Sequence, residues 1–518
     1  MNTLRTHLHS LIQAAAADQR LPKLLAASGA LILGALSLTA AVMVHRIPPL
    51  EWTRIAGVFL FCLIGMVLAA FHVRRFPPKG VDISTSRRIL WTSVFLAIAG
   101  VQIARYALSV QSEPVTATAF LAMAPVVALG LLVSGLLGPP TALVAITLTV
   151  IVAGAAGVEG PTLLAAAWIT GAVGAHAVNP LRHRSDLIRS GQVTTVTFAV
   201  SALAVALLEG AGAKEALMFV AWSVVAGVGG VALFWLAMIA VFERSFGVVS
   251  DWSLHELCNP EQPLLRELVL HAPGTYAHSV MVGNLSEQAA RAIGANALLC
   301  RAMANYHDVG KSKRPEFFIE NNHGENPHDR LTPSLSAKII SIHVRDGLEM
   351  AEKHNLPPAI RDGIAEHHGT SLISYFYHQL TKDSGEEDPI LEHHFRYPGP
   401  KPKSKETAVL MLADRVEAAT RTLSIESPGR LRSFVWEIVQ GVRDDGQLDD
   451  SELNFRDLQI IVDSFVSSLK SLRHHRIEYP GVALDAVEQE PSDTGSEPHE
   501  AQAESQVPAH GLAKDARN

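Results

Sequence analysis

The sequence predicts an all-α protein in two parts, a polytopic helical membrane domain followed by an all-helical cytoplasmic domain. Long apolar runs fill the first half of the chain, and most approach the ~20 residues that a helix needs to cross a bilayer. Further on, apolar residues recur every three or four positions, which is the helical period. No convincing alternation of apolar and polar residues indicates a strand. Helices are therefore expected throughout.

The membrane domain is predicted to extend over residues 24–242 with about eight helices, and about seven is the alternative number of spans. Two short runs, 141–157 and 161–178, could form a tilted pair or a re-entrant hairpin. Residues 1–23 precede it as a cytoplasmic N-terminal segment, because Arg5, Arg20 and Lys23 favour the inner side of a membrane. The first run is too long for a cleaved signal peptide, so we expect it to remain as an anchor. The runs are 24–44, 55–73, 89–110, 117–137, 141–157, 161–178, 193–209 and 216–242.

Two clusters of basic residues predict the orientation of this domain. Loops rich in Lys and Arg face the cytoplasm, so both clusters and everything after Phe242 are expected on that side of a bacterial inner membrane. Charged residues are nearly absent inside the apolar runs, which is typical of an anchor rather than of a transporter. The clusters comprise Arg74, Arg75, Lys79, Arg87 and Arg88 after the second run, and Arg182, His183, Arg184 and Arg189 after the sixth.

A polar connector, residues 243–270, is predicted to lead into a soluble domain at 271–480. The apolar periodicity of that domain is helical. Residues 481–518 lack large apolar side chains and are rich in Glu, Gln, Ser, Pro and Ala, which predicts a disordered tail. The helices expected in the soluble domain are 276–293, 296–308, 334–353, 358–368, 404–424, 430–442 and 455–473.

Composition excludes two kinds of function. The formal net charge of -7 gives no basis for binding a polynucleotide, although a small nucleotide held by a few cations is compatible with it. The three cysteines, Cys62, Cys258 and Cys300, show no paired spacing. A disulfide framework or a thiolate zinc site is therefore not expected.

Histidine and aspartate side chains lie on the apolar faces of five predicted helices. His278 shares a face with Leu285, and Asp414 lies beside Leu410. Polar groups that face a core need partners, because an unsatisfied one costs about 1–3 kcal/mol. The residues concerned are His278, His307, Asp308, His343, His367, His368 and Asp414.

One shared metal centre would satisfy all of these side chains. Imidazole nitrogens and carboxylate oxygens suit Mn, Fe or Zn, and a carboxylate such as Asp308 can bridge two divalent ions ~3.5–4 Å apart. Two such ions would make hydroxide available near neutral pH and would neutralise a phosphoryl group under attack. Lys311 follows Asp308 by three residues, where its ammonium can contact a phosphate oxygen.

Each residue by itself has a simpler interpretation. A buried histidine is usually a satisfied core residue, an isolated lysine is usually exposed, and His367-His368 could end a helix before Gly369. These explanations would have to hold independently at every position. Their joint occurrence in one domain therefore favours the metal centre.

The order of these residues matches that of HD-domain phosphohydrolases. More narrowly, the chain resembles the seven-transmembrane HD phosphohydrolase family over about residues 51–480. The segments that carry the resemblance are Ala272–Ser279 (APGTYAHS), Tyr306–Lys311 (YHDVGK), Phe318–Asn321 (FIEN), His367–Thr370 (HHGT), Phe395–Pro402 (FRYPGPKP) and Met411–Arg415 (MLADR).

The resemblance implies hydrolysis of cyclic di-AMP to the linear dinucleotide pApA, by hydroxide activated at a centre of two Mn or Fe ions. It implies catalytic roles for Asp308 and Lys311, with Lys311 on the phosphate and Tyr397 as a candidate substrate contact. It also implies a division of the metal ligands: His278, His307, Asp308 and Asp414 on one ion, and Asp308, His343, His367 and His368 on the other.

The sequence departs from the family in one respect and leaves two alternatives open. Family members commonly carry a large extracytoplasmic domain after the first span, whereas here that gap is only the loop 45–54. A cyclic di-GMP phosphodiesterase is the close alternative, although its relatives carry His-His-Glu where this chain has His367-His368-Gly369. A membrane receptor that binds a nucleotide without cleaving it is the other. The lipid bilayer is an expected partner, and a homodimer is a candidate assembly.

Overall fold

Helices and loops make up the computed structural model over the residues that it describes. The only β pairing within them is an isolated bridge between Leu372 and Arg396. The all-α prediction is therefore confirmed. The predicted segment 1–23, the first apolar run at 24–44 and the tail 481–518 lie outside the described residues, which are 52–78, 81–109, 115–155, 160–178, 184–322, 324–384, 389–421 and 428–473.

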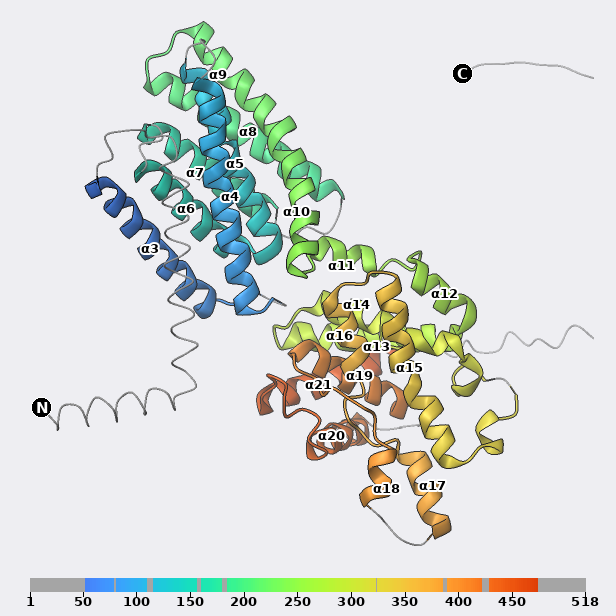
Figure 1. Cartoon of the computed structure of the whole chain (residues 1–518). Helices are drawn as coiled ribbons and strands as arrows, with labels where there is room; N and C mark the ends of the chain where they lie inside the picture. Colours follow the sequence, from blue (N-terminus) through green and yellow to red (C-terminus); the bar gives the residue numbers. More distant parts are fainter. Residues whose placement is uncertain are drawn as a thin grey trace, which may run out of the picture. The chain divides into compact units, whose positions relative to one another are not determined.

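The helices α3 to α10 are apolar and pack against one another around a shared hydrophobic core (Figure 1). Within the described part of the chain, three helical segments are long and apolar enough to cross a membrane: Ile55–Arg75, Ile83–Tyr106 and Ile188–Leu208. The total number of crossings stays a prediction. The bounds are α3 Trp52–Arg75, α4 Ile83–Ser109, α5 Val115–Leu137, α6 Pro139–Ala155, α7 Pro161–Ala177, α8 Arg184–Leu208, α9 Ala213–Val225, the π-helical turn η1 Ala226–Val231 and α10 Ala232–Phe246.

Proline and glycine determine where these helices begin and how closely they pack. Pro139 and Pro161 open α6 and α7, where the missing N–H of proline is not needed by the helix. A Cβ atom on Gly130 would lie 2.9 Å from the carbonyl oxygen of Gly171. The backbones of α5 and α7 therefore approach as closely as small residues allow, a packing mode common between membrane helices.

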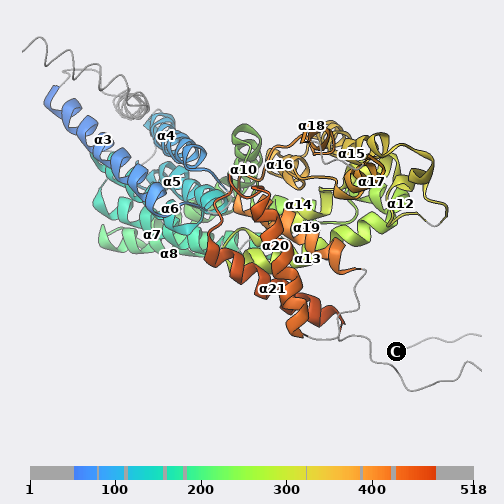
Figure 2. The ribbon, with the colours of Figure 1, turned by 90° about the horizontal axis from the view of Figure 1, so that it is seen from below.

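The helices from α11 to α21 surround a second core, in which α13, α14 and α19 contact one another (Figures 1 and 2). Among the predicted metal ligands, His278 lies on α13 and Asp414 on α19, and His307 directly follows α14. The bounds are α11 Asp251–Leu257, α12 Pro263–His271, α13 Pro273–Ala292, α14 Ala297–Tyr306, α15 Pro333–Lys353, α16 Pro358–Glu366, α17 Ser374–Ser384, α18 Pro389–His394, α19 Lys405–Thr420, α20 Pro428–Asp444 and α21 Phe455–Arg473, with 3-10 turns η2 Val309–Lys313, η3 Pro315–Phe317 and η4 Pro327–Arg330.

Two short helices, α11 and α12, occupy the stretch that was predicted as a polar connector. Ser250 caps α11, because its hydroxyl oxygen accepts a hydrogen bond from the N–H of Ser253 at 3.3 Å. Leu254 and Leu264 are almost fully buried. Helices of 7 and 9 residues are too short to show a clear apolar period, which explains why the sequence did not reveal them.

A tight turn follows α14, which ends at Tyr306 and not at residue 308 as predicted. Asp308 precedes η2, and the three-residue period of a 3-10 turn brings Lys311 over Asp308. The turn passes close to α15, because a Cβ atom on Gly310 would lie 2.0 Å from the carbonyl oxygen of His343. No side chain fits at this position.

Replacing Gly310 should therefore destabilise the turn. We expect Gly310→Ala to lower the free energy of unfolding by more than about 1–3 kcal/mol, the usual cost of overpacking, because the clash is with backbone that cannot yield. Thermal unfolding of the detergent-solubilised chain would measure it. Gly441→Ala is the matched control, because its Cβ would meet nothing within 4 Å in the last turn of α20. Equal melting temperatures for the two variants would contradict the close approach.

Candidate metal centre

Four histidine side chains from four helices converge on the carboxylate of Asp308. One carboxylate oxygen, Oδ2, lies 3.3 Å from Nε2 of His307 and 3.7 Å from Nε2 of His278. The other oxygen, Oδ1, lies 3.3 Å from Nε2 of His343 and 3.6 Å from Nε2 of His367. Asp308 thus has one oxygen directed at each of two imidazole pairs. That is the arrangement in which one carboxylate can bridge two cations.

Asp414 and His368 complete the cluster. Oδ1 of Asp414 lies 3.0 Å from Nε2 of His278 and 3.8 Å from Nε2 of His307. Its Oδ2 lies 3.7 Å from Nδ1 of His368, which extends the cluster toward the second pair. The structure therefore brings together all seven residues predicted as metal ligands, and two groups among them are compact enough to hold an ion: His278, His307 and Asp308, and Asp308, His343, His367 and His368.

The helices orient three of these imidazole rings through backbone carbonyls. In His307, His343 and His367, Nδ1 lies 2.7, 2.6 and 2.8 Å from the carbonyl oxygen three residues earlier. A carbonyl oxygen can only accept, so Nδ1 carries the proton and donates it. In the neutral form of each ring the lone pair is therefore on Nε2 and points into the cluster, as a metal ligand requires.

The cluster is buried and lacks internal partners for some of its polar atoms. His307 is 0% exposed and Asp308 1%. Nε2 of His307 and Oδ1 of Asp308 have no hydrogen-bond partner among the described residues. Leaving such atoms unsatisfied is costly, and a divalent cation coordinated by nitrogen and oxygen would satisfy both. The residues present therefore fit a metal centre.

Carboxylates lie next to imidazoles and an ammonium inside the cluster. Burial and these neighbouring charges shift the pKa values of its side chains. Burial by itself raises the pKa of Asp308, but His307 and Lys311 outweigh it and hold the pKa well below the usual range. Burial lowers the pKa of His307, but Asp308 and Asp414 raise it to about 10. Burial lowers the pKa of His367 to about 4. Without metal, one imidazole is thus held protonated while another is held neutral.

Lys311 is held between two carboxylates. Its Nζ lies 2.7 Å from Oδ2 of Asp308 and 3.0 Å from Oε1 of Glu320. Thr275 at the start of α13 donates a hydrogen bond of 3.0 Å to the same Glu320 oxygen. The ammonium therefore lies beside the cluster in a fixed position. Glu320 belongs to the FIEN segment, but its spacing alone did not predict contact with Lys311.

The ring of Tyr397 stacks on His368, with the ring centroids 4.1 Å apart and an interplanar angle of 27°. Arg396 fixes this loop, because it donates hydrogen bonds of 2.9 Å to the carbonyl oxygen of Thr370 and to Oδ1 of Asp445. Tyr397 thus borders the cluster, as a substrate contact would. Its role stays a prediction.

Arg415, which follows Asp414, was not singled out as a site residue. Its Nε is buried and has no hydrogen-bond partner among the described residues. A charged group with an unused donor next to the cluster is suited to an anionic ligand.

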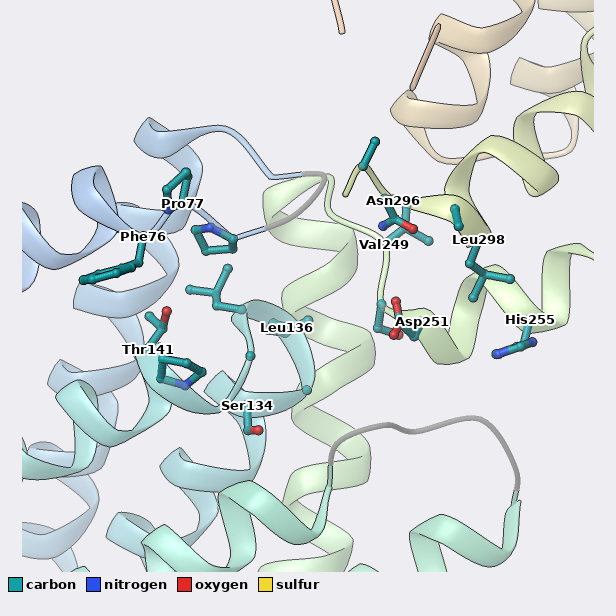
Figure 3. A pocket seen from close by; sticks show the side chains of 18 of the residues that line it. Phe76, Pro77, Ser134, Leu136, Thr141, Val249, Asp251, His255, Asn296 and Leu298 are labelled. Carbon is teal, nitrogen blue, oxygen red and sulfur yellow. The ribbon is translucent and has the colours of Figure 1, made fainter. Parts of the chain in front are cut away.

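A separate hollow of about 790 Å³ is lined by the segment directly after α3 and by residues from α5, α6, α11, α13 and the start of α14 (Figure 3). Ser134, Asp251 and Asn296 are among its polar lining residues. It includes none of the seven residues of the cluster, so the candidate chemistry lies elsewhere.

Comparison with known proteins places the two parts of the chain in related families. Residues 52–250 match the family described as 7TM receptor with intracellular HD hydrolase, and residues 275–419 match the HD domain family. These matches, together with the apolar helices, identify a membrane protein that carries an HD domain. The predicted family is confirmed.

Two curated relatives are cyclic-di-AMP phosphodiesterases named PgpH. The Bacillus subtilis (strain 168) protein is 47% identical over 246 residues, which cover 47% of this chain and 34% of that protein. The Listeria monocytogenes protein is 36% identical over 315 residues, covering 60% of this chain and 43% of that protein. The chain thus spans less than half the length of these relatives.

A solved structure is also similar to part of the chain. It is the crystal structure of the L. monocytogenes PgpH HD domain in complex with cyclic-di-AMP, which is 40% identical with a TM-score of 0.40. The match covers 41% of this chain and 99% of the crystallised chain.

Removal of the central carboxylate should empty the site. We expect Asp308→Asn to lose both ions, because one of its oxygens faces each imidazole pair and an amide is a weak ligand. Elemental analysis of the purified full chain would measure the loss. Asp346→Asn is the control, because Asp346 is buried on α15 but pairs with Lys313 and Arg314. Full metal content in the Asp308 variant would show that the ligand assignment is wrong.

Metal affinity should increase with pH. Below their raised pKa values His278 and His307 hold protons in the metal-free centre, and a neutral imidazole is needed for coordination. The ion held by these two histidines must therefore displace protons, so its binding weakens as pH falls below about 10, the raised pKa of His307. Calorimetric titration in buffers of different ionisation enthalpy would measure the protons released. Binding without proton release would contradict this assignment.

Proposed function

Because residues 52–250 match the family of 7TM receptors with an intracellular HD hydrolase and residues 275–419 match the HD domain, we propose that the chain is a membrane-anchored, metal-dependent phosphodiesterase that hydrolyses cyclic di-AMP to pApA. The observation that carries the proposal is the position of Asp308, with one oxygen toward each of two imidazole pairs. That geometry supports a site for two divalent cations. The names of the relatives support the substrate.

The two oxygens of the Asp308 carboxylate face different imidazoles, so we divide the proposed ligands into two sets, one for each oxygen. His278, His307 and Asp414 hold one cation with Oδ2 of Asp308, and His343, His367 and His368 hold the other with Oδ1. We propose Mn or Fe, which suit nitrogen and oxygen donors without thiolate. When bound, the ions supply an activated water and neutralise charge on the phosphate.

In the reaction, the oxygen of water forms a bond to phosphorus and the bond from phosphorus to the 3′ oxygen breaks. The 3′ oxygen takes a proton, and the product keeps a 5′ phosphate. Lys311 is positioned by Asp308 and Glu320 to contact a phosphate oxygen. Tyr397 offers an aromatic face beside the phosphate, and the unpartnered Nε of Arg415 offers a further donor. Burial keeps bulk water away from these charges and so strengthens them.

We also propose that the HD domain lies on the cytoplasmic side of the bacterial inner membrane. Arg74 and Arg75 end α3, and Arg87 and Arg88 lie near the start of α4, so basic residues flank the turn between these helices. Loops of this kind are retained in the cytoplasm, where a cyclic dinucleotide messenger would be available. A homodimer stays a candidate assembly.

The activity can be tested on the full chain in detergent, loaded with Mn²⁺ and supplied with cyclic di-AMP. We expect pApA as the product and slower hydrolysis of cyclic di-GMP in a parallel reaction. Chromatography of the products would measure both rates. Binding of cyclic di-AMP without any linear product, in a protein with two ions per chain, would instead establish a non-hydrolysing receptor.

Loss of the buried ammonium should slow the reaction without emptying the site. We expect Lys311→Met to reduce kcat/KM about 10²-fold or more, because a fixed positive charge next to the phosphate is removed. Lys313→Met is the control, since this lysine on the same turn pairs with Asp346 and Glu349 and faces solvent. Metal content must stay at the wild-type value. A matching loss of metal would show that Lys311 supports the ligands and does not contact substrate.

A further inference from the structure

His278 differs from three other histidines of the cluster in the partner of its Nδ1 atom. His307, His343 and His367 donate to backbone carbonyls, whereas Nδ1 of His278 faces the carboxylate of Glu417. Glu417 lies on α19, three residues after Asp414 and on the same face of the helix. The two carboxylates of α19 therefore flank the ring, with Oδ1 of Asp414 3.0 Å from Nε2 on its other side.

Arg421 holds the Glu417 carboxylate in place from the next turn of α19. Its Nη2 donates to Oε2 at 2.8 Å and to Oε1 at 3.0 Å, and its Nε lies 3.3 Å from Oε1. The side chain of Glu417 is 9% exposed and that of Arg421 is 39% exposed, so the carboxylate of this ion pair is shielded from solvent while the arginine reaches the surface. A bidentate arginine restricts the carboxylate to one orientation. Glu417 is thereby directed at His278.

Nη2 of Arg421 also lies 3.0 Å from Nδ1 of His278, so two arrangements of protons compete. If Nδ1 accepted from Arg421, the proton of a neutral ring would be on Nε2, which could then bind no cation. If Nδ1 donates to Glu417, the lone pair of Nε2 faces Asp308 and Asp414. Only the second arrangement permits coordination, and an ionised carboxylate favours it.

We propose that Glu417, oriented by Arg421, is a positioning residue that makes the cation held by His278, His307, Asp308 and Asp414 bind more tightly than the second cation. A charged acceptor behind a histidine fixes its tautomer and raises the basicity of its ligand nitrogen more than a neutral carbonyl does. Among the histidines proposed for the second cation, His343 and His367 have neutral carbonyl partners, and Nδ1 of His368 has no carboxylate closer than 3.7 Å in the described structure. The inference rests on the metal centre of the proposed function, and it predicts that the two sites fill in sequence.

Titration of the metal-stripped full chain with Mn²⁺ tests this directly, with free Mn²⁺ followed by its electron paramagnetic resonance signal. We expect two separable affinities in the wild type. In Glu417→Gln the tighter affinity should weaken about 10–100-fold, as is usual when a carboxylate behind a metal-binding histidine is lost, while the weaker affinity stays unchanged. Arg421→Met should weaken Mn²⁺ binding at the same site by a smaller factor than Glu417→Gln does. In this variant Glu417 keeps its charge but loses the arginine that orients it.

Glu406→Gln is the matched control, because Glu406 is a buried carboxylate of the same helix that accepts from the N–H of Asn296 at 2.8 Å. Both affinities should stay at the wild-type value in this variant. An equal loss of both affinities in Glu417→Gln, or no loss, would overturn the inference, as would two equal affinities in the wild type. The titration needs no nucleotide. Sequential binding without hydrolysis of cyclic di-AMP would therefore overturn the proposed activity and leave this inference standing.

Discussion

The carboxylate of Asp308 is the constraint on which the structure of the HD domain depends. It is buried at the centre of four imidazoles and one ammonium, and a carboxylate in that position is stable only while each oxygen has positive charge nearby. Lys311 supplies one such charge from within the chain. The imidazole pairs, one on each side, are each compact enough with Asp308 to hold one cation. The helices around Asp308 are arranged so that this one side chain can contact a positive charge on each side.

Helix ends do much of the positioning. His307 and His367 each follow the last residue of a helix, where their Nδ1 atoms reach the carbonyl of the preceding turn. The 3-10 turn after α14 then brings Lys311 against Asp308 and passes so close to α15 that residue 310 must be glycine. Local backbone geometry thus sets the distances within the cluster. These distances are then maintained by the packing of α13, α14 and α19.

The two halves of the cluster are supported differently. Carbonyls of the same helix orient His343 and His367, so these residues depend only on local structure. His278 depends on Glu417, and Glu417 depends on Arg421, so its orientation requires α13 and α19 to be in contact. A disturbance of that helix pair would act on one cation before the other.

Much of the site could be predicted from the sequence alone. A polar residue on an apolar helical face needs a partner, and helical periodicity reveals such faces, so the seven candidate ligands and the all-α fold could be predicted from local pattern and from the family's motifs. Glu417, Arg421 and Glu320 could not be predicted in this way, because a charged residue on a helix or loop has the same local pattern whether it faces solvent or a histidine 139 positions away. Likewise, the short helices α11 and α12 have too few residues for a period to show. Which carboxylate oxygen faces which imidazole pair, and which histidine has a charged partner, was decided only by the tertiary structure, because those contacts join helices that are distant in the chain.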